Sequence, residues 1–469
     1  MPNNGAGGAI PQDVSTRSWQ YLTIQEAYDV GRAGRVAVAV AGVLALSVGL
    51  LAAGTLLKPN GSAENTSVSQ PAESRPASGL SPLARTIEGL QSKLRSNPDD
   101  HAGWAALGLS YVQQARITAD PTYYPKAEAA FAKSLQIQPK DNAEALTGSA
   151  SLAAGRHDFL GALRLVDQAL KINDYSATAY GVKTDALTEL GRYDDALTAV
   201  QRMVNLRPAI DSLSRVSYSF ELHGDVASAR QTLQRASRDA FSPADKAFTE
   251  YYLGELAWNT GDVAGARVHY DAGLAADPSY IQLVEGRAKT EVAQGDVKAA
   301  LEDLRQVTQI LPQPSFLVEL GELLESTGQQ AAAKEQYDVV RATEQLFAAQ
   351  GVDVDVELAL FEADHGNAAT ALAAAGKGYA KRPLSITAQD AYGWALHAAG
   401  RNADALPLAR QAVRLGSPQP ALWYHLGVIS AAAGDKAGAR KALTKALALN
   451  PHFNPLQAPK ARALLASLA

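Results

Sequence analysis

Apolar residues along most of the chain recur at the three- and four-residue spacing of an amphipathic helix. The segment that begins at Ser81 is typical, with its apolar positions at Leu83, Ile87, Leu90 and Leu94. Stretches of strict apolar–polar alternation are scarce, so β-strands are not expected. Alanine and leucine are abundant, and both lose little side-chain entropy in a helix. The pattern predicts an all-α protein.

One apolar run breaks this pattern, because Val36–Leu57 contains 22 residues without a charge. About 20 apolar residues suffice to cross the hydrocarbon core of a bilayer. Arg32 and Arg35 precede the run and Lys58 follows it. The run is longer than the apolar region of a cleaved signal peptide, and it lacks the amphipathic period of a buried core helix. It predicts an uncleaved transmembrane helix over residues 35–58.

The segments on either side of this run are polar. Residues 1–34 are expected to form a short cytoplasmic tail, because the basic residues before the apolar run outnumber by one those that follow it, with Arg17, Arg32 and Arg35 against Lys58 and Arg75. Residues 59–80 are rich in Ser, Pro, Ala and Asn and lack aromatic residues, which predicts a disordered linker. This layout places the protein in the cell membrane as a single-pass protein, with its large C-terminal part outside the cytoplasm.

A repeat dominates the rest of the chain. A glycine followed five residues later by an alanine recurs eight times, and the glycines lie 33, 37, 34, 33, 38, 34 and 34 residues apart. A period near 34 residues is typical of a helix–turn–helix solenoid. A related pair, Gly155 and Ala162, extends the series. The eight pairs are Gly191/Ala196, Gly224/Ala229, Gly261/Ala266, Gly295/Ala300, Gly328/Ala333, Gly366/Ala371, Gly400/Ala405 and Gly434/Ala439.

Each repeated position has a physical role. The glycine permits the left-handed turn that ends the first helix, and the alanine allows two helices to approach closely. An aspartate after several of these glycines is suited to cap the second helix. A proline near the end of many units stops that helix. These prolines are Pro139, Pro208, Pro278, Pro312, Pro383 and Pro451.

With these positions the chain resembles the tetratricopeptide-repeat family. The resemblance implies about ten units over residues 101–451, wound into a right-handed superhelical α-solenoid. Residues 81–100 and 452–469 are then expected to form capping helices at its two ends. The first unit carries Trp104, Leu107, Gly108, Tyr111, Ala127, Phe131 and Pro139, and the last carries Trp423, Leu426, Gly427, Ala439, Leu443, Ala446 and Pro451.

Catalytic constellations are missing from the sequence. Cysteine is absent, which excludes disulfides, zinc–thiolate sites and thiol nucleophiles. None of the eight histidines forms an i, i+4 pair, and no phosphate-binding loop occurs. The formal net charge is −5 with no basic block, which disfavours nucleic acid. We expect no enzyme activity, no cofactor, no metal and no small-molecule substrate.

The resemblance implies that the first helix of each unit lines a concave face that binds a peptide or protein. A carboxylate-binding clamp is not expected, because Ala105 and Leu109 occupy the corresponding positions of the first unit. Aromatic and acidic side chains on this face favour an extended segment with apolar and basic residues. An alternative is that some of them are packing residues displaced by one position. The candidates are Tyr218, Phe248, Tyr251, Glu255, Trp258, Glu322, Glu325, Asp390, Trp394 and Tyr424.

The sequence therefore predicts a membrane-tethered protein-interaction scaffold, and its composition suggests a GC-rich bacterium. Two other interpretations stay open. One is an accessory subunit of a separate membrane transporter or enzyme. The other is a client-holding factor, because residues 97–112 are similar to the repeat domain of cytochrome c maturation proteins.

Overall fold

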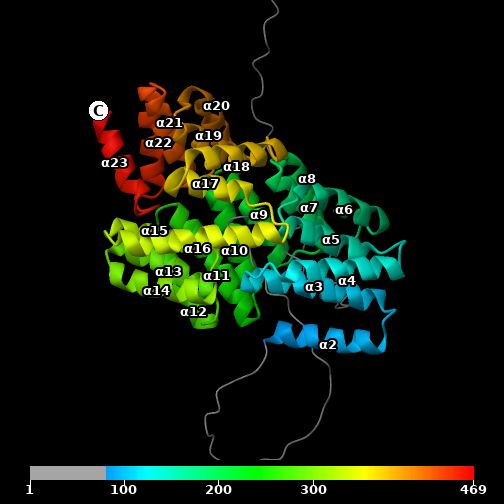
Figure 1. The fold of residues 1–469 in the computed structure, drawn as a ribbon. Coiled ribbons are helices and arrows are strands. Elements are labelled where there is room, and N and C mark those ends of the chain that lie inside the picture. Colours follow the sequence, from blue (N-terminus) through cyan, green and yellow to red (C-terminus); the bar gives the residue numbers. More distant parts are fainter. Residues whose placement is uncertain (1–80, 469) are drawn as a thin grey trace, which may run out of the picture. The chain divides into compact units, whose positions relative to one another are not determined.

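The computed structural model describes residues 81–468, which fold into 22 α-helices, α2 to α23, with no β-strand among them (Figure 1). The expectation of an all-helical solenoid is confirmed for this part of the chain. The predicted cytoplasmic tail over 1–34, transmembrane helix over 35–58 and linker over 59–80 lie outside the described residues. Between residues 81 and 468, no helix combines the length and the apolar character that a membrane span requires.

Twenty of the described helices form ten antiparallel pairs in chain order. The first helices of the pairs are α3 (His101–Thr118), α5 (Ala143–Gly155), α7 (Ala177–Glu189), α9 (Ile210–Leu222), α11 (Pro243–Asn259), α13 (Ile281–Gln294), α15 (Pro314–Ser326), α17 (Asp355–His365), α19 (Ile386–Ala398) and α21 (Pro420–Ala432). The second helices are α4 (Tyr123–Ile137), α6 (Phe159–Ile172), α8 (Tyr193–Leu206), α10 (Val226–Arg238), α12 (Val263–Ala276), α14 (Val297–Ile310), α16 (Gln330–Ala349), α18 (Ala368–Lys381), α20 (Asn402–Ala412) and α22 (Lys436–Leu449).

A single helix flanks the array at each end of the described range. Helix α2 (Pro82–Ser96) buries Leu83, Ile87 and Leu94 against the first pair. Helix α23 (Gln457–Ser467) buries Ala458 and Ala461 against the last pair. Both helices therefore cover apolar surface that the terminal pairs would otherwise expose.

The turn within each pair follows the repeated residues. Seven of the eight repeat glycines have a positive φ, between 75° and 88°. Gly366 is the exception, because its φ is −141° and the Glu362 carboxylate instead accepts a hydrogen bond from the next backbone N–H. The left-handed turn predicted at Gly366 is therefore wrong. The repeat alanines are confirmed as close-approach positions, since each is at most 2% exposed.

Capping and stop signals also act as the sequence predicts. The aspartates after four turn glycines are N-caps, and each accepts a hydrogen bond from a backbone N–H three residues later. Every repeat proline lies two residues beyond the end of a second helix, where its ring does not interrupt the helical hydrogen bonds. The caps are Asp225, Asp262, Asp296 and Asp435.

Consecutive pairs are joined through aromatic rings on the second helices. Tyr270 of α12 is fully buried between Gly254 of its own pair and Gly286 of the next. A Cβ atom at either glycine would lie 2.4–2.5 Å from the ring, so only glycine fits. Phe131 lies in the same way between Gly108 and Gly148.

Pairs that are far apart in the sequence also meet, at a separation of about 190 residues. Arg382, beyond α18, donates to the Glu189 carboxylate at the end of α7 over 2.9 Å, and both side chains are 6% exposed. The Ile386 N–H donates to the Tyr193 hydroxyl over 3.0 Å, and the Asn450 amide donates to the Trp258 carbonyl over 2.8 Å. We call this set the turn-to-turn contact. In Figure 1 the contact lies where the end of α18 approaches α7 and α8.

The turn glycines of the earlier pairs fit against backbone of the later pairs. A Cβ atom at Gly191 would lie 2.1 Å from the carbonyl carbon of Leu384, and one at Gly224 would lie 2.7 Å from the carbonyl oxygen of Gly416. Nothing lies within 4 Å of the corresponding position at Gly434. Two separate constraints therefore require glycine at turns such as Gly191. One is the positive φ, and the other is the close approach of backbone in the turn-to-turn contact.

Candidate functional site

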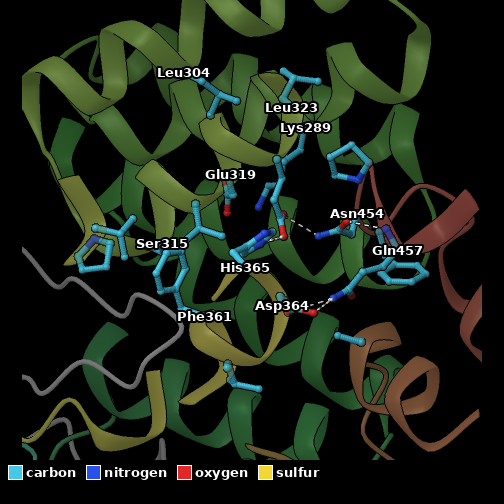
Figure 2. A pocket seen from close by; sticks show the side chains of 18 of the residues that line it. Lys289, Leu304, Ser315, Glu319, Leu323, Phe361, Asp364, His365, Asn454 and Gln457 are labelled. Carbon is cyan, nitrogen blue, oxygen red and sulfur yellow. Dashed lines mark hydrogen bonds and ion pairs between the residues drawn. The ribbon is translucent and has the colours of Figure 1, made fainter. Parts of the chain in front are cut away.

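A cavity of about 530 Å³ opens on the inner side of the array, between the first helices of the sixth to eighth pairs and the segment after α22. Its walls come from α13, α15, α16 and α17, with residues 452–457 on the opposite side. Figure 2 shows Glu319 and His365 on one side, and Asn454 and Gln457 facing them. Ser315 lies at its exposed edge, so the cavity connects with solvent.

Lys289 of α13 is the centre of a charge cluster at one end of the cavity. Its ammonium group lies 2.7 Å from Glu255 and 2.8 Å from Glu285, and the Glu255 carboxylate also accepts from the Tyr270 hydroxyl over 2.6 Å. Burial and the nearby carboxylate of Glu285 raise the pKa of Glu319 well above its usual value. The cluster holds three carboxyl groups and one ammonium group.

The segment after α22 inserts two amides among carboxylates of distant helices. Asn454 donates to Glu322 over 2.7 Å, and the other oxygen of Glu322 lies 3.0 Å from Nε2 of His365. Gln457 reaches both oxygens of Asp364 at 3.3 and 3.4 Å. Neutral amides thus contact two acids of the cavity without supplying a compensating charge (Figure 2).

Two further carboxyl groups line the cavity with oxygens that have no hydrogen-bond partner. These atoms are Oε2 of Glu344 on α16 and Oε2 of Glu357 on α17. Glu344 is only 4% exposed. Burial, followed by the proximity of Glu357 and Glu362, raises the pKa of Glu344 from 4.5 to about 8.

The cavity is therefore acidic with apolar walls. Five carboxyl groups line it, whereas its basic side chains are one lysine and three histidines. Between them lie aliphatic and aromatic side chains, including Val340, Leu360 and Phe361. Such a site recognises a ligand with two features. One is a polar group that contacts the acids, and the other is an apolar stem that packs along the walls. The acids are Glu319, Glu322, Glu344, Glu357 and Asp364.

The aromatic residues predicted to be exposed for binding are mostly buried, so that expectation of exposure is wrong. Residues of the same and of neighbouring helices cover them. Phe248 packs against Tyr252, with ring centroids 4.8 Å apart. Trp394 stacks on His425 at 4.1 Å. The buried candidates are Phe248 at 1%, Tyr251 at 6%, Trp258 at 6%, Trp394 at 7% and Tyr424 at 4% exposure.

The candidates are also spread over different environments. Trp258 and Glu322 line the cavity, whereas Tyr218 is half-buried and packs near Ile386 across the turn-to-turn contact. Glu325 accepts from the Tyr337 hydroxyl over 2.9 Å, and Asp390 pairs with buried His425 at 2.9 Å. A binding role for the predicted residues stays a prediction, with Trp258 and Glu322 the two best placed for it.

Several cavity residues escaped the sequence prediction, although one of them carries a readable signal. The predicted residues Tyr218, Glu255, Glu322 and Trp394 each lie six residues before a turn glycine, and Lys289 occupies the same position before Gly295. The other cavity residues occupy different positions within their repeats or lie beyond α22. Only the tertiary fold brings them to the cavity. The cavity residues missed are Lys289, Glu319, Glu344, Glu357, Asp364, His365, Asn454 and Gln457.

Family models agree with this architecture. Two tetratricopeptide-repeat models match residues 420–453 and 220–281. The first range contains α21 and α22, and the second contains α11 and α12. These matches show that the chain contains tetratricopeptide repeats, and the ten helix pairs repeat the same helix–turn–helix arrangement. Proteins with such repeats bind protein partners.

Similar proteins of other organisms share these repeats over part of their length. Cellulose synthase 1 operon protein C of Komagataeibacter xylinus is 26% identical over 254 residues, which are 52% of this chain and 16% of that protein. The protein CTR9 homolog of Arabidopsis thaliana is 25% identical over 242 residues, which are 50% of this chain and 22% of that protein. The matched part of this chain thus spans less than a quarter of either relative.

Solved structures resemble the chain at lower identity. A tetratricopeptide-repeat protein from Parabacteroides merdae is 20% identical, with a TM-score of 0.33, and the match covers 55% of this chain and 98% of that one. Human IFIT1, solved with m7Gppp-AAAA, is 14% identical, with a TM-score of 0.44, over 71% of this chain and 77% of that one.

The raised pKa of Glu344 predicts a pH-dependent stability. Between pH 4.5 and about 8 the folded protein keeps a proton on Glu344 that the unfolded chain has lost, so the free energy of unfolding falls as the pH rises. Glu344→Gln removes this pH-dependent loss of stability, because glutamine does not titrate. We expect the free energy of unfolding of the variant, relative to that of the unmodified protein, to rise by on the order of 3 kcal/mol from pH 5 to pH 9, as measured by urea unfolding.

Glu335→Gln is the matched control, because Glu335 lies on the same helix and is exposed. Its stability relative to the unmodified protein should not change with pH. A Glu344→Gln effect of the same size at pH 5 and pH 9 would contradict the assignment of a buried carboxyl group.

Proposed function

We propose that the protein is a non-catalytic, membrane-tethered scaffold that binds a segment of a partner protein in the acidic cavity. The observation that supports this site is the cavity itself. Its volume of about 530 Å³ lies within the range of roughly 300–1,000 Å³ that is usual for ligand sites. An indole from Trp258 and the acids of α15 to α17 line it, so it offers both apolar and charged contacts.

Burial of the other candidates favours this location over the rest of the inner face. Neighbouring helices bury the aromatic residues of α11, α19 and α21 that an extended peptide would otherwise contact. Trp258 and Glu322 keep access to the cavity, and Ser315 marks its exposed edge. A partner segment that enters past Ser315 would meet these side chains without displacing a helix.

The membrane tether in this proposal is supported by the sequence of residues 36–57. A single anchor followed by the linker over 59–80 would hold the repeat array close to the bilayer. Partners that reside in or near the membrane would then meet it at a high effective concentration.

A photo-crosslinking group at Ser315 tests the binding site. We expect a crosslinked partner from the cell envelope, and we expect its yield to fall at least ten-fold when Val318→Trp fills the cavity. The same group at Val268, which is 66% exposed on α12, is the control and should give no such product. An equal yield with Val318→Trp, in a variant that melts like the unmodified protein, would refute binding in the cavity.

The crosslinked products also distinguish the two alternatives from a dedicated scaffold. An accessory subunit should yield one stoichiometric membrane transporter or enzyme, whereas a client-holding factor should yield many unrelated chains at low occupancy.

A double substitution in the apolar run tests the tether. Leu44→Arg together with Leu46→Arg would place two charges near the centre of the predicted span, at a cost of about 3 kcal/mol each. We expect the full-length protein to sediment with membranes after carbonate extraction, and the double variant to stay in the supernatant. If both proteins sediment equally, the anchor assigned to residues 35–58 is wrong.

A further inference from the structure

Three carboxyl groups of the cavity have a buried oxygen without a hydrogen-bond partner. Glu319 lies beside Lys289, whereas the other two, Glu344 and Glu357, come from consecutive helices. Glu344 comes from the last turns of α16 and Glu357 from the first turn of α17. Each has a buried Oε2 atom without a hydrogen-bond partner, and the proximity of Glu357 disfavours the charge on Glu344. An uncompensated buried carboxyl group destabilises a fold, so its presence in a cavity indicates a role other than packing.

The cations near this pair already have other partners. Arg341 donates to Glu362 over 2.9 Å and lies 5.0 Å from the centre of the Phe361 ring. Lys289 is held by Glu255 and Glu285. His157 lies 3.8 Å from Glu357, but its Nδ1 is hydrogen-bonded at 2.8 Å to the Asp353 carbonyl.

We infer that Glu344 and Glu357 form a subsite for the guanidinium or ammonium group of an arginine- or lysine-bearing segment of the partner protein. Two carboxyl groups that line one cavity match the forked donors of a guanidinium group once Glu344 releases its proton on binding. Val340 lies one turn before Glu344, and Phe361 lies one turn after Glu357, so both can pack along the methylene stem of the same side chain.

This inference rests on the proposed function, because it names the chemistry of the segment that enters the cavity. A protein segment is favoured over a small free cation by the size of the cavity. Its apolar residues extend from Val292 on α13 to Phe453 after α22, well beyond the two carboxyl groups. An occupant that covers this surface needs several side chains, of which the cation is one.

Two pools of capped pentapeptides test the inference on the full-length protein. One pool has arginine at its centre and four randomised positions, and the other has citrulline, a neutral side chain of the same shape, at its centre. We expect the immobilised protein to retain the arginine pool at least ten-fold more than the citrulline pool. The preference should disappear in the double variant Glu344→Gln and Glu357→Gln, and it should persist in Glu335→Gln, which is altered on the outer side of α16.

The possible outcomes separate this inference from the function on which it rests. Equal retention of both pools would overturn the cation subsite but leave peptide binding intact. Retention of neither pool would overturn both. A preference that survives the double variant would place the recognition elsewhere. Displacement of the arginine pool by an equal concentration of methylguanidinium would assign the subsite to a free cation and refute the protein segment. Thermal unfolding of each variant verifies that it is folded.

Discussion

The turn-to-turn contact is the constraint on which the rest of the structure depends. Helix pairs separated by about 190 residues meet through the buried Glu189–Arg382 ion pair and through turn glycines that fit against backbone. An ion pair removed from water stabilises a fold only when its geometry is good and its partners are fixed, and here the glycine turns supply that fixed geometry. Where the segment after α22 meets α15 and α17, it forms one wall of the acidic cavity.

This closure changes the character of the inner face from an open groove to an interior rich in ionisable groups. Most of these groups are paired. Arg215 makes two hydrogen bonds to Asp185, with both side chains at most 5% exposed, and Lys289 binds Glu255 and Glu285. Glu344 is one of several exceptions, because its Oε2 has no partner and burial raises the pKa of the carboxyl group. Most buried charges of this interior have partners, whereas this acid in the cavity has none. A cation from another molecule would supply the missing partner.

The sequence predicts the local structure well, because the repeat is set by residues that act within one or two units. Turn glycines such as Gly191, N-caps such as Asp262 and stops such as Pro383 act through their own backbone conformation, so their roles follow from spacing. Gly366 fails because a side chain, Glu362, replaces the expected turn. The inner face was predicted less well, because exposure depends on how side chains of neighbouring helices pack together, which the repeat period does not reveal. Phe248 and Trp394 are on the predicted helices and are nevertheless buried.

The most direct test of the central claim compares alanine at two turn glycines. Gly191 and Gly434 have φ values of 76° and 85°, so alanine should cost either turn about 1–2 kcal/mol from backbone conformation alone. At Gly191 the new methyl group would also meet Leu384 across the turn-to-turn contact, whereas at Gly434 it would meet nothing within 4 Å. We predict that urea unfolding will show Gly191→Ala to lose about 2 kcal/mol more than Gly434→Ala. Equal losses would contradict the turn-to-turn contact.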